Sequence, residues 1–178
     1  MDLKKKQSDF EFKIMQGFMS LADTLRPHVP ARAESFGVAP GMTVADYGCG
    51  PGRYTVEFAR LVWAEGKVYA VDLLPIALQE TEKRLKKFGF DNVECKLARG
   101  YDSRIPTGAA DMVCAVDMFH RVDPAPFLNE VHRIAKADGV LVISGGHQSR
   151  DSIKPAVAAS GLWVLTEECE NFLKYGKA

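Results

Sequence analysis

The stretch VADYGCGPGR, residues 44–53, decides the fold class of this chain. It begins as a short, mostly apolar run that is typical of a buried strand, and helix-forming sequence follows it. Three glycines, Gly48, Gly50 and Gly52, lie between the two elements. Glycines at this density let a backbone pass close to a ligand. We therefore expect a nucleotide-like cofactor to lie across this turn.

Apolar strands and amphipathic helices alternate outward from the turn. The pattern predicts strands at 43–47, 67–71, 93–97, 111–116 and 140–144, and helices at 54–63, 76–87, 125–135 and 150–159. Such alternation indicates an α/β fold, a parallel sheet with helices on both faces. Two last strand-like pieces, 162–165 and 172–175, leave no room for a helix between them. They predict a hairpin, and so one antiparallel strand.

The N-terminal part has a helical pattern of its own. Apolar residues recur at helical spacing from Phe10 to Leu25, two prolines end that run, and a second short helix is expected over 31–36. We predict a helical cap over residues 1–40 and a cofactor-binding domain over 41–178, together one structural unit.

Composition excludes several classes of protein. A chain of 178 residues with 47% hydrophobic and 26% charged residues is long enough for one globular domain with a core. The formal net charge is zero, so no overall field favours nucleic acid or an anionic membrane. No apolar run approaches the roughly 18 residues that span a bilayer, and the N-terminus lacks the apolar core of a signal peptide. We expect a soluble cytoplasmic protein with no nucleic-acid or membrane partner.

The four cysteines are widely separated and show no zinc-site spacing, so we predict reduced thiols and no metal. Cys49 lies between two glycines of the turn. The absence of a paired base favours a small tolerated residue there over a nucleophile.

A second carboxylate narrows the choice of cofactor. Asp72 ends the second predicted strand about twenty residues after the last glycine, where it can accept hydrogen bonds from a ribose diol. The glycine spacing is shorter than that of a dinucleotide site, and Pro51 removes a backbone donor that a phosphate needs. Asp46 would repel a pyrophosphate, but it favours the sulfonium and α-ammonium of S-adenosylmethionine. The pattern favours S-adenosylmethionine over NAD, and a nucleotide-dependent oxidoreductase is the weaker alternative.

These segments resemble a known family. VADYGCGPG (44–52), together with 68–72, 110–122 and 137–144, is similar to the class I S-adenosylmethionine-dependent methyltransferases, closest to their small UbiE-like or type 11 branch. The resemblance extends from about Pro27 onward. It implies a Rossmann-like, seven-stranded, doubly wound sheet in the order 3-2-1-4-5-7-6 with strand 7 antiparallel. It also implies methyl transfer to a small-molecule acceptor that the sequence does not identify, with S-adenosylhomocysteine as product.

The resemblance also implies residue roles. Asp46, Tyr47, Gly48 and Gly50 surround the methionine end of the cofactor. Asp72 takes the ribose and Leu73 packs against the adenine.

At the position where the family holds the adenine amine with an Asp, this chain has Arg99, followed by Gly100. A guanidinium cannot accept from an amine. Recognition there would use backbone groups or Asp102, or cofactor affinity is weakened.

The loop 116–122 matches the floor of the family's active site. Asp117 is expected at the methionine ammonium, and His120 is a candidate catalytic base for an acceptor oxygen or nitrogen. The alternative is that His120 only opens the loop by bonding to backbone, since methyl transfer often needs only proximity and alignment. His147 follows the fifth strand, and it either lines the acceptor pocket or starts the next helix.

Two further possibilities stay open. The chain is either a methyltransferase or a non-catalytic S-adenosylmethionine-binding sensor or partner subunit. The amphipathic N-terminal helix packs either over the pocket or across the axis of a homodimer.

Overall fold

The computed structural model describes residues 29–145 and 149–178. The predicted helix at 10–25, most of the predicted cap and His147 lie outside the described residues. The strands are β1 (Thr43–Tyr47), β2 (Lys67–Asp72), β3 (Val93–Leu97), β4 (Ala110–Val116), β5 (Ala135–Ser144), β6 (Trp163–Glu168) and β7 (Leu173–Lys177). The helices are α2 (Val29–Ser35), α3 (Arg53–Val62), α4 (Pro75–Phe88), α5 (Pro124–Ile134) and α6 (Arg150–Ala158), with a 3₁₀ turn η1 (Phe119–Arg121).

The seven strands form one sheet in the order β3-β2-β1-β4-β5-β7-β6, which confirms the predicted topology. The first five strands pair in parallel, and β7 runs antiparallel to both β5 and β6. β6 and β7 pair antiparallel because only a short turn joins them. A parallel pair would need a long crossover connection.

Two element boundaries differ from the prediction by three residues or more. β5 begins at Ala135, where it pairs with Ala110, and a register irregularity follows before Met112. β6 continues to Glu168 rather than ending at Leu165. The extension is held by its partner strand, since the Lys174 ammonium lies 3.0 Å from the Glu167 carboxylate.

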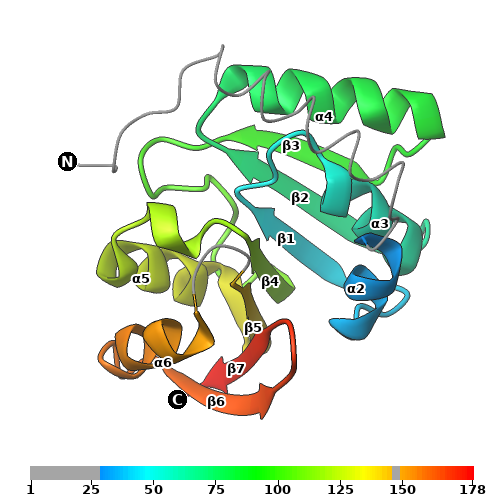
Figure 1. Cartoon of the computed structure of the whole chain (residues 1–178). Helices are drawn as coiled ribbons and strands as arrows, with labels where there is room; N and C mark the ends of the chain where they lie inside the picture. The colour runs from blue at the N-terminus through cyan, green and yellow to red at the C-terminus, as the bar shows by residue number, and fades with distance from the viewer. Residues whose placement is uncertain (1–28, 146–148) are drawn as a thin grey trace.

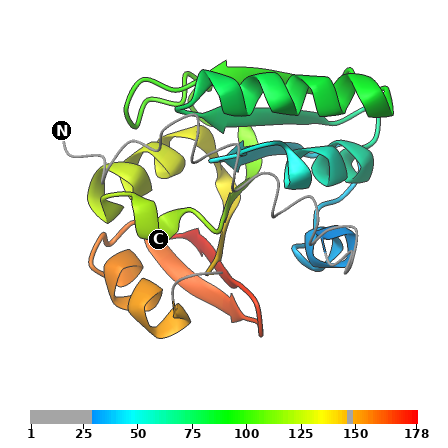
Figure 2. The ribbon, with the colours of Figure 1, turned by 45° about the horizontal axis from the view of Figure 1, so that its top comes forward.

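Alternating side chains along the strands contribute to two separate cores. On β1, Val44 faces the core shared with α2 and α3, whereas Ala45 and Tyr47 face the core shared with α5 and α6. Figure 1 and Figure 2 show the helices divided between the two faces in this way. The sheet is therefore covered on both sides, as parallel sheets require.

Helix α2 belongs to the same core as the sheet. Phe36, directly after this helix, is fully buried. Its ring centroid lies 6.1 Å from that of Tyr54 on α3 and 5.0 Å from that of Phe172 in the turn before β7. These aromatic contacts bring the start of the described chain to the carboxyl ends of the central strands.

Candidate functional site

The glycine turn lies between the carboxyl end of β1 and the start of α3 (Figure 1). β1 has β2 on one side and β4 on the other, so the strand order reverses here. Ligands of doubly wound sheets bind outside the carboxyl ends of the strands at such a reversal. The turn therefore occupies the expected ligand position.

Every backbone N–H of residues 48–52 is already used inside the protein. The N–H groups of Gly48 and Cys49 donate to the Val71 carbonyl at 2.8 and 2.9 Å. The Gly50 N–H donates to Asp72 Oδ2 at 2.9 Å, and the Gly52 N–H donates to the Cys49 carbonyl at 3.0 Å. Pro51 has no N–H. These five residues offer no donor to a pyrophosphate, which strengthens the case against a dinucleotide.

Two of the glycines are needed for different reasons. Gly52 has φ +76°, and a Cβ on it would lie 2.8 Å from the Thr81 hydroxyl of α4, so only glycine lets the two helices approach this closely. Gly50 has φ +54°, and no atom lies within 4 Å of the place that a Cβ would take, so its outer side is open. The Thr81 hydroxyl also donates to the Gly50 carbonyl at 3.0 Å and fixes the turn from behind.

The thiol of Cys49 is buried in this turn beside Thr81. Burial, followed by the charges of Asp72 and Asp46, raises the pKa of Cys49 well above its usual value. A thiol that stays protonated is a poor nucleophile. Cys49 is thus a packing residue.

Asp46 lies inside the protein, with only 2% of its surface exposed. Its Oδ2 accepts a hydrogen bond from Thr55 Oγ1 at 2.6 Å. Burial raises the pKa of Asp46 to about 7, the Thr55 bond lowers it, and the charge of Asp72 raises it. A cation placed near this carboxylate would be strongly favoured, because it would stabilise a charge that burial penalises.

Asp72 joins the end of β2 to the glycine turn. Its Oδ2 accepts from Gly50 and its Oδ1 accepts from the Leu74 N–H, each at 2.9 Å. Burial raises its pKa, while the backbone bonds and the charge of Arg121 lower it. Each carboxylate oxygen can accept a second hydrogen bond. The carboxylate is therefore held in place and still able to accept from a diol.

Three buried polar atoms without a hydrogen-bond partner gather beside the turn. Five such atoms occur among the described residues: Arg32 Nε, Tyr54 Oη and Asp117 Oδ1 lie here, and Asn92 Oδ1 and Tyr175 Oη lie elsewhere in the molecule. Burial raises the pKa of Tyr54, the charge of Arg32 lowers it and the charge of Asp117 raises it. The three side chains therefore lie close enough to interact. Arg32 also lowers the pKa of Tyr54 as a hydrogen-bond donor, although its contact with the Tyr54 hydroxyl falls outside normal hydrogen-bond geometry.

Ser144, at the end of β5, links two of these residues. Arg32 donates through Nη2 to the Ser144 hydroxyl and, at 3.2 Å, to the Asn171 carbonyl. The Asp117 N–H donates to the Ser144 carbonyl at 3.0 Å. Asp117 itself has φ +54°, a conformation that few residues other than glycine, Asn and Asp adopt. Unpaired buried polar groups are costly, so this group points to a ligand.

The carboxyl ends of β2 and β3 are lined quite differently. Leu73 and Leu97 are 37% and 40% exposed. Leu97 is the register partner of Asp72, so it lies beside the residue that is predicted to bind the ribose. Arg99 follows two residues later with an exposed side chain. Leu73 and Leu97 form an open apolar edge next to Asp72, and Arg99 lies at its end.

The loop after β3 is a tight turn. Arg99 and Asp102 exchange two backbone hydrogen bonds of 2.9 and 3.2 Å, and Gly100 between them has φ +65°. Asp102 Oδ1 accepts from the Arg104 N–H at 2.8 Å. One oxygen of the Asp102 carboxylate is thus engaged within its own loop.

The side chain of Tyr47 lies on the other face of the sheet. It is buried, its ring packs edge-on against Phe127 at 5.2 Å, and its hydroxyl donates to the Tyr101 carbonyl at 2.7 Å. Only the backbone of Tyr47 could therefore contact a cofactor at the glycine turn. His120 lies in η1, half-buried, on the same edge of the sheet as the glycine turn.

The sequence reasoning missed Arg32, Tyr54 as a polar group, and Leu97. The buried, unpartnered atoms of Arg32 and Tyr54 are visible only in three dimensions, because they depend on what surrounds each side chain. Leu97 had a readable signal, since it ends a predicted strand directly next to the one that ends in Asp72.

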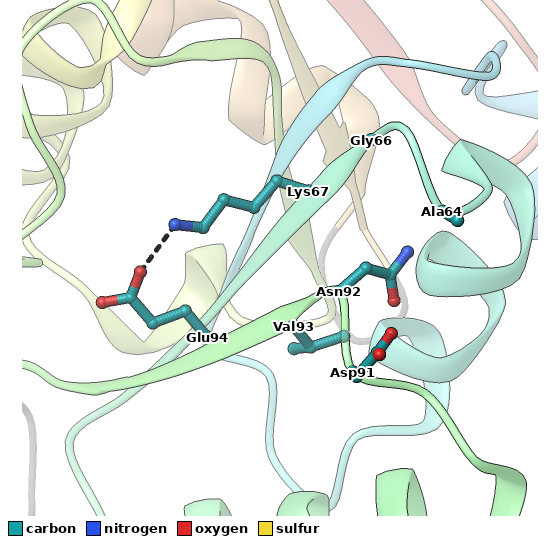
Figure 3. A pocket seen from close by; sticks show the side chains of 7 residues that line it. All are labelled: Ala64, Gly66, Lys67, Asp91, Asn92, Val93 and Glu94. Atoms are coloured by element: carbon teal, nitrogen blue, oxygen red, sulfur yellow. Dashed lines mark hydrogen bonds and ion pairs between the residues drawn. The ribbon is translucent and has the colours of Figure 1, made fainter.

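A pocket on the opposite edge of the sheet is not part of this site. It is lined by Ala64, Gly66, Lys67, Asp91, Asn92, Val93 and Glu94, and Figure 3 shows the ion pair between two of these residues, Lys67 and Glu94. Lys67 and Val93 are the first residues of β2 and β3. The pocket therefore lies at the amino ends of the strands, away from the glycine turn.

Within residues 29–145 and 149–178 there is no cluster of three metal-binding side chains. In the same part of the chain, every helix is too short or too polar to cross a bilayer.

Comparisons with known proteins agree with this geometry. A family model for a methyltransferase domain matches residues 39–170. Protein-L-isoaspartate O-methyltransferase from Ignicoccus hospitalis is 29% identical over 118 residues, 66% of this chain and 54% of that protein. Demethylmenaquinone methyltransferase from Geobacillus stearothermophilus is 30% identical over 106 residues, 59% of this chain and 45% of that protein. The chain thus spans about half the length of these curated relatives.

Among solved structures, a SAM-dependent methyltransferase from Aquifex aeolicus has the same fold. It superposes with a TM-score of 0.82 at 23% identity, covering 97% of this chain and 98% of that one. With the strand order and the glycine turn, the match over residues 39–170 shows that the chain belongs to the class I S-adenosylmethionine-dependent methyltransferase domains.

Proposed function

We propose that this domain transfers a methyl group from S-adenosylmethionine to a small-molecule acceptor, mainly by holding the two in line and excluding water. The observation that carries the proposal is the group of unpartnered buried atoms beside the glycine turn: Arg32 Nε, Tyr54 Oη and Asp117 Oδ1. When bound, the cofactor supplies an electrophilic methyl group on a sulfonium, and the residues of this chain bind and orient it.

The unpartnered atoms fit the amino-acid end of the cofactor. A zwitterion needs donors for its carboxylate and acceptors for its ammonium, and the three atoms provide both kinds. Arg32 and Tyr54 would donate to the carboxylate, and Asp117 would accept from the ammonium. The raised pKa of Asp46, about 7, is consistent with a buried carboxylate that a nearby cation would ionise.

The remaining residues would hold the nucleoside. Asp72 is fixed by Gly50 and Leu74 and has acceptor capacity left for the ribose diol. Leu73 and Leu97 would pack on the base, since they are the exposed apolar side chains at that edge. Fixing the cofactor at both ends would align its reacting centre with the acceptor, and such alignment can lower a reaction barrier by several kcal/mol, on the order of 7–11.

The chemistry at the acceptor depends on whether the acceptor must lose a proton. His120 lies on the same edge of the sheet as the glycine turn, and it is the candidate base for an acceptor that must lose a proton. The relatives do not identify the acceptor, because the name of one specifies a protein isoaspartyl group and the name of the other a menaquinone precursor.

Cofactor binding tests the first half of the proposal. In titration calorimetry we expect S-adenosylmethionine and S-adenosylhomocysteine to bind and NAD to give no heat, because residues 48–52 have no free N–H for a pyrophosphate. Binding of NAD without binding of the methyl donor would rule the proposal out.

Turnover tests the second half. Incubation with S-adenosylmethionine and fractionated metabolites should release S-adenosylhomocysteine with at least one fraction. A protein that binds the cofactor but produces none with any fraction is the sensor or partner subunit instead. With an acceptor in hand, a catalytic His120 predicts that His120→Gln lowers kcat by about 100-fold or more and flattens the pH profile. A structural His120 predicts lower thermal stability with an unchanged profile.

A further inference from the structure

The loop that follows β3 is held from two sides. Residues 99–107, the base-end loop, lead from the open apolar edge toward the start of β4. Before its tight turn, the Ala98 N–H donates to the Asp72 carbonyl at 2.9 Å, which continues the β2–β3 pairing. After the turn, Ser103 directly follows Asp102 and is fully buried. The sheet therefore fixes one end of the turn, and whatever holds Ser103 fixes the other.

A carboxylate on α5 holds Ser103. Glu130 Oε1 accepts from the Ser103 N–H at 2.9 Å and from the Ser103 hydroxyl at 2.5 Å. Arg133, one turn further along the helix, donates to both oxygens of Glu130 at 2.7 and 2.8 Å. Its guanidinium also donates to the Ile105 carbonyl at 2.9 Å and to the Thr107 hydroxyl at 3.0 Å. Glu130 and Arg133, together the α5 clamp, thus bind three residues of the base-end loop.

The α5 clamp carries a largely buried charge, since the Glu130 side chain is 10% exposed. Burial raises the pKa of the Glu130 carboxyl, but the hydrogen bonds from Arg133 and Ser103 outweigh burial and leave the pKa below its usual value. The carboxylate is therefore ionised at neutral pH. Replacing a buried ion pair by apolar side chains is often neutral for stability. Such a pair is thus better suited to fixing one geometry than to holding the fold together.

The backbone that the α5 clamp holds is strained. Arg104 lies between Ser103 and Ile105 and has φ +61°. Its N–H donates to Asp102 Oδ1 at 2.8 Å. A side chain other than glycine adopts this conformation at a cost, and the conformation persists only where the surrounding contacts determine it. The α5 clamp therefore imposes a shape on the base-end loop that the chain alone does not favour.

That shape decides which backbone groups of the turn are available. The N–H groups of Arg99 and Asp102 are used within the turn, whereas those of Gly100 and Tyr101 donate to no acceptor in the described part of the chain. With the ribose on Asp72, as the proposed function has it, the base extends across the ends of β2 and β3 toward this turn. The two N–H groups are then donors whose distance from the base depends on how the turn is held.

We propose that Glu130, fixed by Arg133, is a positioning residue for the nucleoside of the cofactor. Through Ser103 it sets the place of the turn at 99–102, and so it sets the affinity for the adenosine part of the ligand. Glu130 acts through the base-end loop rather than by touching the ligand. The inference rests on the proposed function, which places the ribose at Asp72.

Two ligands separate the ends of the site. S-adenosylhomocysteine carries both the nucleoside and the amino-acid end, whereas 5′-methylthioadenosine carries the nucleoside without the amino acid. In titration calorimetry we expect Glu130→Gln to weaken both ligands by the same factor, about tenfold, because one amide oxygen cannot accept from Ser103 and Arg133 together. Asp117→Asn should weaken S-adenosylhomocysteine alone.

Asp111→Asn is the matched control. Asp111 also combines a backbone bond, from the Thr43 N–H at 2.8 Å, with an ion pair, to Lys136 at 2.6 Å. It lies at the amino ends of β1 and β4, away from the ligand. Thermal unfolding should show a loss of stability in both Asp111→Asn and Glu130→Gln. The affinity of Asp111→Asn for either ligand should stay within about twofold of the wild type.

Ser103→Ala is the second test variant, and it also serves if Glu130→Gln does not fold. It removes the hydroxyl bond but leaves the Ser103 backbone N–H and the Glu130–Arg133 pair in place. We expect it to weaken both ligands by about threefold.

Unchanged binding of 5′-methylthioadenosine to folded Glu130→Gln, or to Ser103→Ala in its place, would overturn the proposal and leave the α5 clamp a stabilising contact. An equal loss in Asp111→Asn would overturn it as well, because the effect would then follow from lowered stability. A loss confined to S-adenosylhomocysteine would assign the effect to the amino-acid end, against the proposal. Failure of the wild type to bind either ligand would instead overturn the proposed function, so the two results are distinguishable.

Discussion

At the ends of β1 and β4 the site is lined by buried polar groups, whereas at the ends of β2 and β3 it is lined by exposed leucines and an arginine. Asp46 and the unpartnered atom of Asp117 belong to the first region, and Leu73, Leu97 and Arg99 to the second. Buried polar groups without partners are costly in the folded protein. An exposed apolar edge costs little.

The difference separates two tasks. The buried region holds charge in a low-dielectric setting, where a misplaced group is expensive and interactions with a zwitterion are strong. The exposed region offers contact area and one flexible cation, and its sequence can vary without unfolding the protein. We therefore expect substitutions in the buried region to change stability and affinity together, and substitutions in the exposed region to change mainly selectivity.

The glycine turn should show the largest effect. Gly52→Ala places a Cβ 2.8 Å from the Thr81 hydroxyl and 3.0 Å from the Thr81 Cα, at a residue with φ +76°. Positive φ and overpacking together should lower the free energy of unfolding by about 3 kcal/mol. Urea denaturation measures this loss.

Gly89→Ala is the matched control for that substitution. Gly89 ends α4 with φ +75°, and nothing lies within 4 Å of its Cβ position. It carries the same backbone strain without the steric contact, so its loss should be about 1 kcal/mol. Equal losses for the two variants would mean that the approach of α3 to α4 does not require glycine.

The unpartnered carboxylate should give the next largest effect. Asp117→Asn keeps the shape of the side chain, and asparagine tolerates the positive φ of this position. Loss of a charged acceptor should weaken S-adenosylmethionine binding by about 30-fold, while the stability of the apo protein stays the same or rises. Calorimetry and thermal unfolding measure the two quantities.

Asp123→Asn makes the same change of charge nearby. Asp123 is exposed at the start of α5, where its Oδ1 accepts from Ala125 at 3.3 Å. We expect it to leave cofactor affinity within about twofold of the wild type, as an exposed charge is screened. An equal loss in both variants would show that Asp117 acts only through long-range charge.

Asp46 makes the buried region sensitive to pH. Its pKa is raised to about 7, so at pH 7 roughly half of the protein carries a proton there. A bound cation would ionise the carboxylate and release that proton. Calorimetry at pH 7 in buffers of different ionisation enthalpy should show a release of about half a proton on binding of S-adenosylmethionine.

The same shift fixes how stability changes with pH. Because the folded-state pKa lies above the ordinary value of 3.8, the native state binds more protons between pH 4 and 7, and stability falls as pH rises through that window. Asp46→Asn should therefore gain stability over the wild type as pH rises to 7, and should release no proton on binding. Release that persists in Asp46→Asn would assign the proton to another group.

The sheet was predictable because its information is local. Apolar strands such as 67–72 and the glycines of the turn indicate their structure within a few residues. The end of β6 was not, because Glu167 and Glu168 have the composition of a loop and become strand only through pairing with β7.

The residues of the candidate site also fall into two groups, those that local sequence predicts and those that depend on distant parts of the chain. Asp46, Asp72 and the glycines follow from spacing along the chain. Arg32 does not, because its role depends on Ser144 and Asn171, more than a hundred residues away. The surroundings of the Tyr47 side chain also depend on tertiary structure, because the strand alone does not show which helices cover the face to which this side chain points.

Tyr47 should give the smallest effect, and it tests whether the two regions are coupled. Its hydroxyl donates to the Tyr101 carbonyl at 2.7 Å, so β1 supports the turn that carries Arg99 and Gly100. Tyr47→Phe leaves that carbonyl without its partner and should cost about 1 kcal/mol of stability. A looser turn should weaken S-adenosylhomocysteine binding about threefold, measured by calorimetry.

Tyr101→Phe separates support of the turn from mere loss of a hydroxyl. The Tyr101 hydroxyl accepts from the Asp123 N–H at 2.8 Å, and Asp123 belongs to the start of α5 rather than to the open apolar edge. Its removal should lower stability by a similar amount without changing affinity. If Tyr47→Phe also leaves affinity unchanged, the base end is ordered independently of β1, and the buried and exposed regions act as separate sites rather than as two ends of one.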